Sequence, residues 1–487
     1  MSLTVLATQI LEDAKVIDQE LDKTSKEVLP SPINSSFIKK VSRRSRRLSR
    51  AFGSCLSSPF RRNVNSEKGN RIDSPIRKSN DTTNKFSELS DFERYSQIPE
   101  NLEPVKDSLV DKCHQLRALV ETPEAAITNI YTNWTELVSL EAVCHFRLFD
   151  AIPPLGSATY AQIAEASQIP QDLVFRFIRL CIINGIFCEP IPGHVHHTPR
   201  SRWLLTRGPG LLDLIAVNYF EFAPAGLRYV EAIEKYKVIE EPNQSPFALA
   251  NDNLPIYETL DRDEERRLRF GQSMQYLTSG ESYDLRYILS SYNWASIDTV
   301  GARLLDVGGG LGHISAYIAA HTKELHFVVQ DLPPVVADAI ARKSSLVDTH
   351  LLDRITFLPL SFFTPHSSST PKFDVIFLRW ITHNWSDKYT RQIFRAMIPA
   401  LKKGGQVFIV EYLLNEESPG VIATQTIGLR MDMIMGVGFS AKERTAGDLR
   451  ILLEEVAQEF GGSWSNWAVT KPEGSVISFI RVVWNGE

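Results

Sequence analysis

The run LLDVGGGLGHISAYIAA, residues 304–320, passes from a strand-like pattern through a cluster of glycines to a helix-like pattern. Gly308, Gly310 and Gly312 have the spacing G-x-G-x-G, and Asp306 precedes them. Glycine lets the backbone approach a ligand closely, and the first turn of the following helix presents free N–H groups. The run therefore predicts a strand, a tight turn and a helix, with a small-molecule site at the turn.

The spacing of these glycines also bears on the type of ligand. A dinucleotide site follows the pattern G-x-G-x-x-G, and this chain has His313 where the third glycine would stand. The pattern therefore disfavours NAD. Because tight turns between strands and helices also use glycine for packing, the loop alone does not identify the ligand.

Apolar strands alternate with helical runs from residue 295 to the C-terminus. The strand-like runs are RLLDVG, HFVVQD, ITFLPL, DVIFLRW and QVFIVEYLL. This alternation predicts an α/β fold with a mostly parallel sheet that is covered on both faces. After the last helix, two strands joined by Lys-Pro-Glu-Gly predict an antiparallel hairpin at one edge of the sheet.

The composition is that of a globular protein. A chain of 487 residues, 43% of them hydrophobic, is long enough for two or three domains. Five cysteines without C-x-x-C spacing argue against a disulfide framework and a zinc site. No apolar run is long enough to cross a bilayer, and acids interrupt the N-terminal apolar pattern. We therefore expect a cytoplasmic protein without a membrane partner.

The net charge of −5 conceals a strongly basic segment. Between Lys39 and Lys85 there are 14 Lys or Arg and 3 Asp or Glu, a net charge of +11, which leaves −16 for the rest of the chain. Residues 1–28 have helical spacing, whereas 29–104 contain few large apolar groups. Such a segment cannot offset its ordering entropy, so we predict a disordered insert. A solvated insert is favoured over an import signal, a kinase target or a polyanion-binding arm.

Residues 105–225 are mostly helical in pattern. Two helices with a turn at 168–170 are followed by FCEPIPGHVHHTPRSRWLL, which predicts a two-stranded wing. A winged helix raises the alternative of DNA binding. The second helix, however, is apolar nearly all round, which is typical of a core or an interface. We therefore predict a dimerisation domain without a nucleic-acid partner, followed by connecting helices over 226–294.

The wing carries three histidines, His194, His196 and His197. Two of them would lie on one face of a strand, but no carboxylate or thiol lies close in sequence to complete a metal site. The strand ends also carry no acidic cluster suited to magnesium. No metal is predicted.

Two polar residues follow other strands of the predicted sheet. Asp331 ends HFVVQD, where a carboxylate can accept hydrogen bonds from both ribose hydroxyls; a helix N-cap is the alternative. His383 follows DVIFLRW, and ligands of open α/β sheets bind beyond the carboxyl ends of strands. The imidazole is therefore either a proton acceptor or a turn residue without chemistry.

Five runs in a fixed order resemble a known family: LLDVGGGLG, VVQDLPPVV, LRWITHNWSDKY, LKKGGQVFIVEYLL and AKERT. Residues 105–487 resemble the plant and fungal small-molecule O-methyltransferases of the caffeate and sterigmatocystin type, which are class I S-adenosylmethionine-dependent enzymes. The resemblance implies a Rossmann-like catalytic domain at 295–487, a preceding winged-helix dimerisation domain joined by the N-terminal helix, and a homodimer. The implied cofactor contacts are Asp306, Gly308, Gly310, Gly312, Asp331, Ser361, Phe362 and Arg379.

The resemblance also implies how the histidine works. In the family, the histidine of the H-D/N-W motif takes the proton from the acceptor hydroxyl, and His383 has that position. A phenol with a pKa near ~10 is a poor nucleophile at neutral pH, and an imidazole with a pKa near ~6.5 is a suitable base. Two acids flank the family's histidine and orient it, and their counterparts are Glu411 and Glu443. The alternatives are strand-end solvation for Glu411 and a surface ion pair with Arg444 for Glu443.

Two positions depart from the family pattern. Asn384 stands where many relatives carry Asp, which removes one negative charge beside the base. Ser361 stands where relatives carry an Asp that contacts the adenine amino group; a serine accepts that hydrogen bond more weakly. We expect the second change to affect cofactor affinity rather than chemistry.

The acceptor pocket is predicted over the sheet tips. Its implied walls are Phe270 and Met274, with Met431 and Met435 from the run RMDMIMGVGF, which also holds Met433. Methionine side chains adapt to a flat aromatic ring, although at least one of these three is expected to be core packing on a helix. A small phenolic or polyketide-like acceptor in secondary metabolism is the favoured interpretation. N-methylation, a non-methylating reaction and a cofactor-sensing winged-helix regulator are the alternatives.

Overall fold

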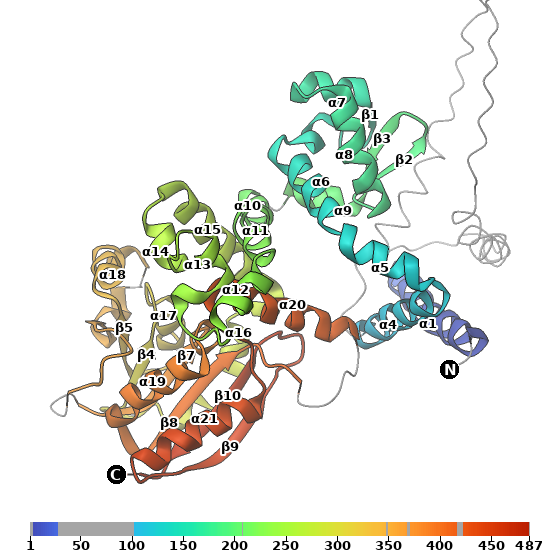
Figure 1. Ribbon diagram of the computed structural model, residues 1–487. Helices are drawn as coiled ribbons and strands as arrows, with labels where there is room; N and C mark the ends of the chain where they lie inside the picture. The colour runs from blue at the N-terminus through green and yellow to red at the C-terminus, as the bar shows by residue number, and fades with distance from the viewer. Residues whose placement is uncertain are drawn as a thin grey trace, which may run out of the picture. The chain divides into compact units, whose positions relative to one another are not determined.

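The computed structural model describes residues 3–27, 102–206, 208–346, 349–367, 371–415 and 422–486 (Figure 1). The chain forms two compact units, residues 1–109 and 110–487. All but the last three residues of the predicted insert at 29–104 lie outside the described residues. The division into domains by sequence therefore stays a prediction.

In the described residues, the first unit contains one complete long helix and the first part of a second. Helix α1 (Leu3–Glu27) covers the predicted helical segment and buries Leu6 and Ile17. The hydroxyl of Ser108, at the start of α4 (Glu103–Val120), donates to the Asp13 carboxylate at 3.2 Å. A polar contact therefore joins the two helices.

The second unit begins with a bundle of helices and a small sheet (Figure 1). The helices are α5 (Pro123–Thr132), α6 (Trp134–His145), α7 (Tyr160–Ser167), α8 (Gln171–Ile183), α9 (Pro199–Thr206) and α10 (Pro209–Val217). The strands are β1 (Ser157–Thr159), β2 (Phe187–Ile191) and β3 (His194–His197). Strand β3 pairs antiparallel with both β1 and β2. The predicted helix, turn, helix and wing are all present, and β1 makes the wing three-stranded.

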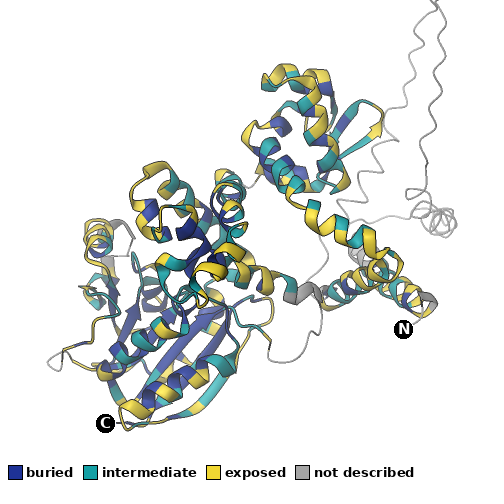
Figure 2. Ribbon diagram, in the orientation of Figure 1, coloured by how far each residue is buried: buried dark blue, intermediate teal, exposed yellow. Residues whose placement is uncertain are grey.

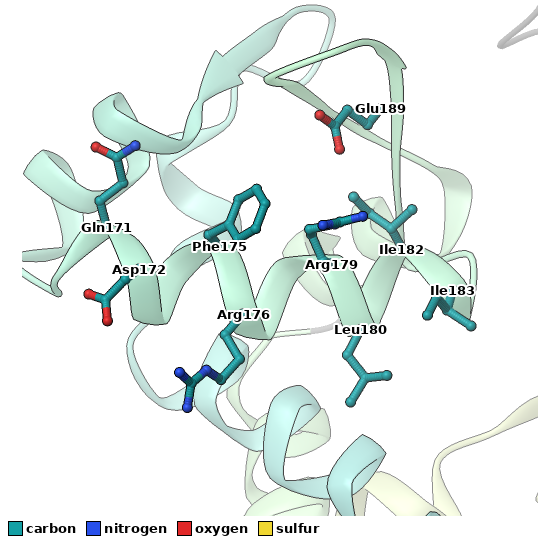
Figure 3. Close-up of a pocket in the computed structure, with 9 residues that line it drawn as sticks. All are labelled: Gln171, Asp172, Phe175, Arg176, Arg179, Leu180, Ile182, Ile183 and Glu189. Atoms are coloured by element: carbon teal, nitrogen blue, oxygen red, sulfur yellow. The ribbon is translucent and has the colours of Figure 1, made fainter. Parts of the chain in front are cut away.

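Helix α8 is buried on one side within this chain, so burial of its other side in an interface, as its apolar pattern allowed, stays a prediction. Val174, Ile178 and Cys181 face the core of this bundle. Phe175 and Ile183 are 42% and 78% exposed and line an open groove of about 1060 Å³ (Figure 3). Charged side chains also line the groove: Asp172, Arg176 and Arg179 of α8 and Glu189 of β2. The exposed surface of α8 is therefore a mixture of apolar and charged residues.

Helices connect this bundle to the large sheet. They are α11 (Ala223–Gly226), α12 (Tyr229–Tyr236), α13 (Pro246–Ala250), α14 (Ile256–Asp261), α15 (Glu264–Thr278) and α16 (Arg286–Ser290). Short helical turns η5 (Glu281–Tyr283) and η6 (Trp294–Ser296) flank α16. Helix α10 packs along α15, so the connecting helices are continuous with the preceding bundle.

The C-terminal part is a seven-stranded sheet in the order β6-β5-β4-β7-β8-β10-β9. Its strands are β4 (Arg303–Val307), β5 (His326–Asp331), β6 (Ile355–Pro359), β7 (Phe373–Arg379), β8 (Leu401–Glu411), β9 (Trp464–Thr470) and β10 (Ser478–Trp484). The first five strands in this order are parallel, and β10 runs antiparallel to β8 and β9. The predicted α/β fold and its antiparallel edge are both confirmed.

Both faces of the sheet are buried, as its continuous apolar strands require (Figure 2). Neighbours such as Leu304 and Leu305 point to opposite faces. One face packs on α19 (Asp387–Met397) and α21 (Ala446–Glu459). The other packs on α16 and α17 (His313–Ala319). The remaining helices, α18 (Pro333–Leu346) and α20 (Ile422–Phe439), follow β5 and β8.

None of the helices in the described ranges is long and apolar enough to cross a membrane. Cys113, Cys144, Cys181 and Cys188 are free thiols, and Cys55 lies outside the described residues.

Candidate active site

The glycine turn lies at the carboxyl ends of the parallel strands. Gly308, Gly310 and Gly312 all have positive φ, at 67°, 58° and 79°, a region that other residues rarely adopt. A Cβ at Gly308 would lie 2.5 Å from Cδ1 of Ile381, so a larger residue would have to displace that side chain in addition to adopting the strained backbone. At Gly310 the same Cβ would meet nothing within 4 Å, so this side of the turn is open. The turn can therefore receive a ligand along its backbone.

Asp306 and Arg379 lie beneath this turn, at the ends of β4 and β7. Asp306 is buried and accepts a 2.6 Å hydrogen bond from the hydroxyl of Ser315. Burial raises the pKa of Asp306 to about 6, although the charge of Arg379 opposes the shift. Burial lowers the pKa of Arg379 to about 10, and its Nε has no partner among the described residues. The two opposite charges therefore share one buried environment at the base of the turn.

Asp331, the last residue of β5, holds the turn from the other side. Its Oδ2 accepts from the Gly310 N–H at 2.8 Å, and its Oδ1 accepts from the Leu332 N–H at 2.7 Å. Neither contact is that of a helix N-cap, which binds the second or third N–H of its helix. Each carboxylate oxygen keeps a lone pair, so both can still accept from ribose hydroxyls.

Ser361 and Phe362 follow β6 on the same edge of the sheet. The Ser361 hydroxyl accepts a local hydrogen bond from the Phe363 N–H at 3.3 Å. The Phe362 ring lies 3.7 Å from the position of a Cβ at Gly308 and packs edge-on against Trp385 at 5.8 Å. Phe362 therefore lies beside the glycine turn, and Ser361 offers only a partly engaged hydroxyl.

His383 is in the short turn η8 (Thr382–Asn384), directly after β7 and Trp380. The residue is 8% exposed, and its Nδ1 lies 3.0 Å from Oε1 of Glu443. A carboxylate accepts hydrogen bonds, so Nδ1 carries the hydrogen and Nε2 of the neutral ring is a proton acceptor. Within the described ranges Nε2 has no hydrogen-bond partner. Glu443 is itself 2% exposed, so the alternative of a surface ion pair is wrong.

Glu411 contacts the backbone of this turn rather than the imidazole ring. Its Oε1 accepts from the N–H groups of Ile381, Thr382 and His383 at 3.1, 2.6 and 3.2 Å. Its Oε2 accepts from the Thr382 hydroxyl at 2.6 Å. Both acids expected to orient His383 contact it, but differently: Glu443 binds the ring, and Glu411 binds the backbone. The spacing of residues in sequence could not distinguish these two contacts.

Sequence reasoning gave Arg444 only a surface role, yet this side chain is 1% exposed and central to the turn. Its guanidinium donates to the carbonyls of Thr382 and Trp385 at 2.8 and 2.7 Å. It also forms an ion pair with Asp387 at 2.9 Å. The carbonyls of Thr382 and Trp385 lie outside any α-helix, so Arg444 supplies hydrogen bonds that a helix would otherwise provide. The adjacent residues Glu443 and Arg444 thus hold the ring and the backbone of the same turn.

Trp380 was also missed. It adopts a left-handed backbone with φ of 56°, which is uncommon for a bulky residue. Its ring centroid lies 4.9 Å from that of His383 and 6.1 Å from that of Tyr283 in η5. The side-chain amide of Asn384 donates to the Trp380 carbonyl at 3.2 Å. An aspartate, which many relatives carry at this position, could not donate this hydrogen bond when ionised. A non-glycine left-handed residue leaves no clear signal in a single sequence.

The four predicted acceptor walls are not equivalent. Phe270 on α15 and Met431 on α20 are half-buried and pack at the margin of one apolar cluster. Met274 is also half-buried on α15, whereas Met435 is 5% exposed inside the core of that cluster. Met435 is therefore core packing, and Met433 is 56% exposed. Phe270, Met274 and Met431 remain candidates for the wall.

The wing histidines have structural contacts. His197 is buried; its Nε2 lies 3.0 Å from the Ile152 carbonyl and its Nδ1 lies 2.9 Å from the Ser201 hydroxyl. His194 lies 3.4 Å from the Ser157 hydroxyl. No group of three metal-ligating side chains occurs in the described part of the chain.

Two family models match the chain. Residues 235–458 match an O-methyltransferase domain, and residues 136–207 match an O-methyltransferase dimerisation domain. The O-methyltransferase kk1A of Curvularia clavata is 31% identical over 80% of this chain and 89% of its own length. The chlorophenol O-methyltransferase of Trichoderma longibrachiatum is 27% identical over 80% of this chain and 82% of its own.

Solved structures share the fold at lower identity. OxaC, in complex with sinefungin and meleagrin, is 18% identical with a TM-score of 0.63 over 82% of this chain and 97% of its own. A pericyclic reaction enzyme is 16% identical with a TM-score of 0.62 over 82% and 98%. On the domain matches and the extent of the sequence similarity, this chain belongs to the family of S-adenosylmethionine-dependent O-methyltransferases.

Proposed function

We propose that this protein transfers a methyl group from S-adenosylmethionine to a hydroxyl of a small aromatic acceptor, with His383 as the general base. The observation that carries the proposal is the 3.0 Å contact between Nδ1 of His383 and Glu443, which leaves Nε2 free. This pair lies at the carboxyl edge of the sheet, beside the glycine turn, where ligands of such sheets bind.

The residues at the glycine turn suit the methyl donor. The turn is open at Gly310, and Asp331 keeps lone pairs for two ribose hydroxyls. Arg379 has a buried N–H without a partner among the described residues, which a ligand oxygen would satisfy. Bound S-adenosylmethionine supplies a methyl group already activated on a sulfonium sulfur, which the acceptor oxygen attacks in line.

His383 moves the proton in this reaction. Nε2 takes the hydroxyl proton as the oxygen attacks, because neutral phenol is a weak nucleophile at neutral pH. The ring becomes an imidazolium, and the carboxylate of Glu443 stabilises that charge through Nδ1–H. Glu411 and Arg444 keep the turn in place through its backbone N–H and carbonyl groups. The base therefore keeps its position relative to the glycine turn.

The acceptor is proposed to lie against Phe270, Met274 and Met431. Aromatic and thioether side chains suit a flat ring. A relative named for chlorophenol, and fungal relatives named as O-methyltransferases, are consistent with a phenol in secondary metabolism. Cytoplasmic activity is the corresponding expectation for the location.

A homodimer is proposed from the exposed apolar side chains of the dimerisation region. Helix α5 has no buried residue. Ile127 and Ile130 on this helix are 62% and 73% exposed, and Trp134 at the start of α6 is 64% exposed. Apolar patches of this kind mark interfaces. Light scattering should give twice the chain mass, and Ile130→Asp should reduce it; a wild-type monomer would contradict this assignment.

The decisive experiment measures transfer of labelled methyl from S-adenosylmethionine to a panel of phenols. Wild type, His383→Ala and His321→Ala are compared, since His321 is an exposed histidine of the same domain. We expect phenol-dependent transfer to fall roughly 10²-fold or more in His383→Ala and not in His321→Ala. Cofactor affinity, measured by calorimetry, should be similar in all three proteins.

Other results would favour other functions. Transfer that His383→Ala leaves unimpaired would make His383 a turn residue and the proposed base wrong. Transfer to amines alone would indicate N-methylation. Cofactor binding without any methyl transfer would favour a non-methylating reaction, which the shared fold with a pericyclic enzyme allows. Retardation of DNA at low salt, where electrostatic binding is strongest, would favour a regulator.

A further inference from the structure

A cavity of about 410 Å³ lies on the large sheet, away from the glycine turn and the His383 turn. Its floor crosses several strands: Phe377 of β7 is paired with Phe408 of β8, and Phe408 is paired with Arg481 of β10. Paired residues on neighbouring strands point to the same face. Phe479, two residues before Arg481, extends this surface toward the carboxyl edge. None of the proposed catalytic or cofactor residues lines the cavity.

One wall of the cavity is a fixed aromatic group. Tyr292 packs on Phe408 with ring centroids 4.7 Å apart, and Trp294 packs on both rings at 5.4 and 5.8 Å. The Tyr292 hydroxyl is held by Gln406 at 3.0 Å and by Ser296 at 2.9 Å. Because both the ring and its hydroxyl are held in place, the wall exists without a ligand.

Arg481 is the only charged residue among those that line the cavity. It is half-buried, and its guanidinium carbon lies 5.7 Å from the Tyr292 ring centroid. In the ranges that the structure describes, no carboxylate forms an ion pair with it. Arginine stays charged in proteins and binds carboxylates in a planar, two-pronged geometry. The cavity therefore combines flat aromatic surfaces with one unpaired positive charge.

We propose that this cavity is a second small-molecule site, which binds a flat aromatic anion such as an aryl carboxylate. The ring would lie against Phe408, Phe479 and Trp294, and the carboxylate would bind the Arg481 guanidinium. The volume falls within the roughly 300–1,000 Å³ of known ligand pockets. Because no catalytic residue contributes, the proposal does not depend on the identity of the acceptor or on His383 as the base.

The test is calorimetric titration of the full chain with 2-naphthoate, with S-adenosylhomocysteine present to fill the cofactor site. Arg481→Gln removes the charge. Ala468→Phe fills the floor opposite Arg481 and keeps the charge. Arg450→Gln is the matched control, because Arg450 stacks on Trp467 at 5.5 Å but is paired with Glu454 at 2.7 Å outside the cavity.

We expect 2-naphthoate affinity to fall about 10-fold or more in Arg481→Gln and Ala468→Phe, and to change less than about twofold in Arg450→Gln. The neutral ester methyl 2-naphthoate, which has no hydroxyl to methylate, should bind wild type more weakly, and its affinity should not change in Arg481→Gln. Methyl transfer to a phenol should persist in all three variants. No saturable binding by wild type, or equal affinity in all four proteins, would overturn the proposal. A lower assembly mass in Arg481→Gln, without wild-type naphthoate binding, would assign this face to a second copy instead.

Discussion

Two regions of the molecule each contain a buried histidine and a buried glutamate: the dimerisation region (residues 136–207) and the carboxyl edge of the large sheet around Gly308 and His383 (the catalytic edge). Only at the catalytic edge are the two residues in contact. His383 and Glu443 are 8% and 2% exposed and lie 3.0 Å apart. In the dimerisation region His197 is bonded to Ile152 and Ser201, and Glu141 on α6 is 5% exposed. One oxygen of Glu141 lacks a hydrogen-bond partner in the described structure, as does Oε2 of Glu443.

The difference shows that burial alone does not make a catalytic base. Both nitrogens of His197 are used to satisfy neighbouring polar groups, so this ring contributes to folding. His383 uses one nitrogen to bind a carboxylate, and among the described residues the other has no hydrogen-bond partner, which is what the proposed base requires. The acids differ as well: Glu443 contacts the imidazole of His383 at 3.0 Å, whereas burial raises the pKa of Glu141 to about 7.

The largest effect is expected for Glu443→Gln, which removes the charge and keeps the size of the side chain. The amide still accepts from Nδ1–H but stabilises the imidazolium less, so kcat should fall on the order of 10²- to 10³-fold. Methyl-transfer kinetics and chemical denaturation should be measured together. Glu411→Gln is the control: it should lower the free energy of unfolding, because it disturbs four hydrogen bonds to the turn. Equal kinetic and stability losses in the two variants would mean that the two acids have the same role.

The next effect concerns Glu141 and pH. The pKa of its carboxyl rises from 4.5 to about 7 on folding, chiefly because of burial. The folded state thus binds the proton more tightly than the unfolded state, and stability from this group is lost as pH rises from about 4.5 through 7. Glu141→Gln should therefore raise the free energy of unfolding by about 2–3 kcal/mol at pH 8, with little effect near pH 4.5. If urea denaturation showed the same change in the free energy of unfolding at every pH, the pKa of Glu141 would not be raised by folding.

The smallest effect is expected for His197→Phe, which keeps a ring beside Phe187 but removes both hydrogen bonds. Leaving the Ile152 carbonyl and Ser201 hydroxyl without their partner should cost about 2 kcal/mol in the free energy of unfolding. Methyl transfer per folded molecule should not change. A loss of kcat without a loss of stability would contradict the purely structural role of this histidine.

Much of the catalytic edge could be predicted because its signals are local. The glycine turn has positive φ at three of its five residues, all glycines, and His383 lies in a sequence run that resembles a motif of the family. The contact of Glu411 could not be predicted, because it depends on how the end of β8 meets the turn after β7. An apolar pattern also does not state which face of α8 packs within the chain, because core and interface positions are equally apolar.

The sequence by itself determined the alternation of apolar strands and helices, the glycine turn, the α/β class and the position of the candidate histidine after a strand. These follow from backbone preferences and from residues close together in the chain. Only the tertiary structure decided that Glu443 binds the imidazole, that Glu411 and Arg444 bind the backbone of its turn, and that Arg481 faces an aromatic cavity. Each of these contacts joins residues that are distant in sequence, so each exists only after the sheet and its helices have packed together.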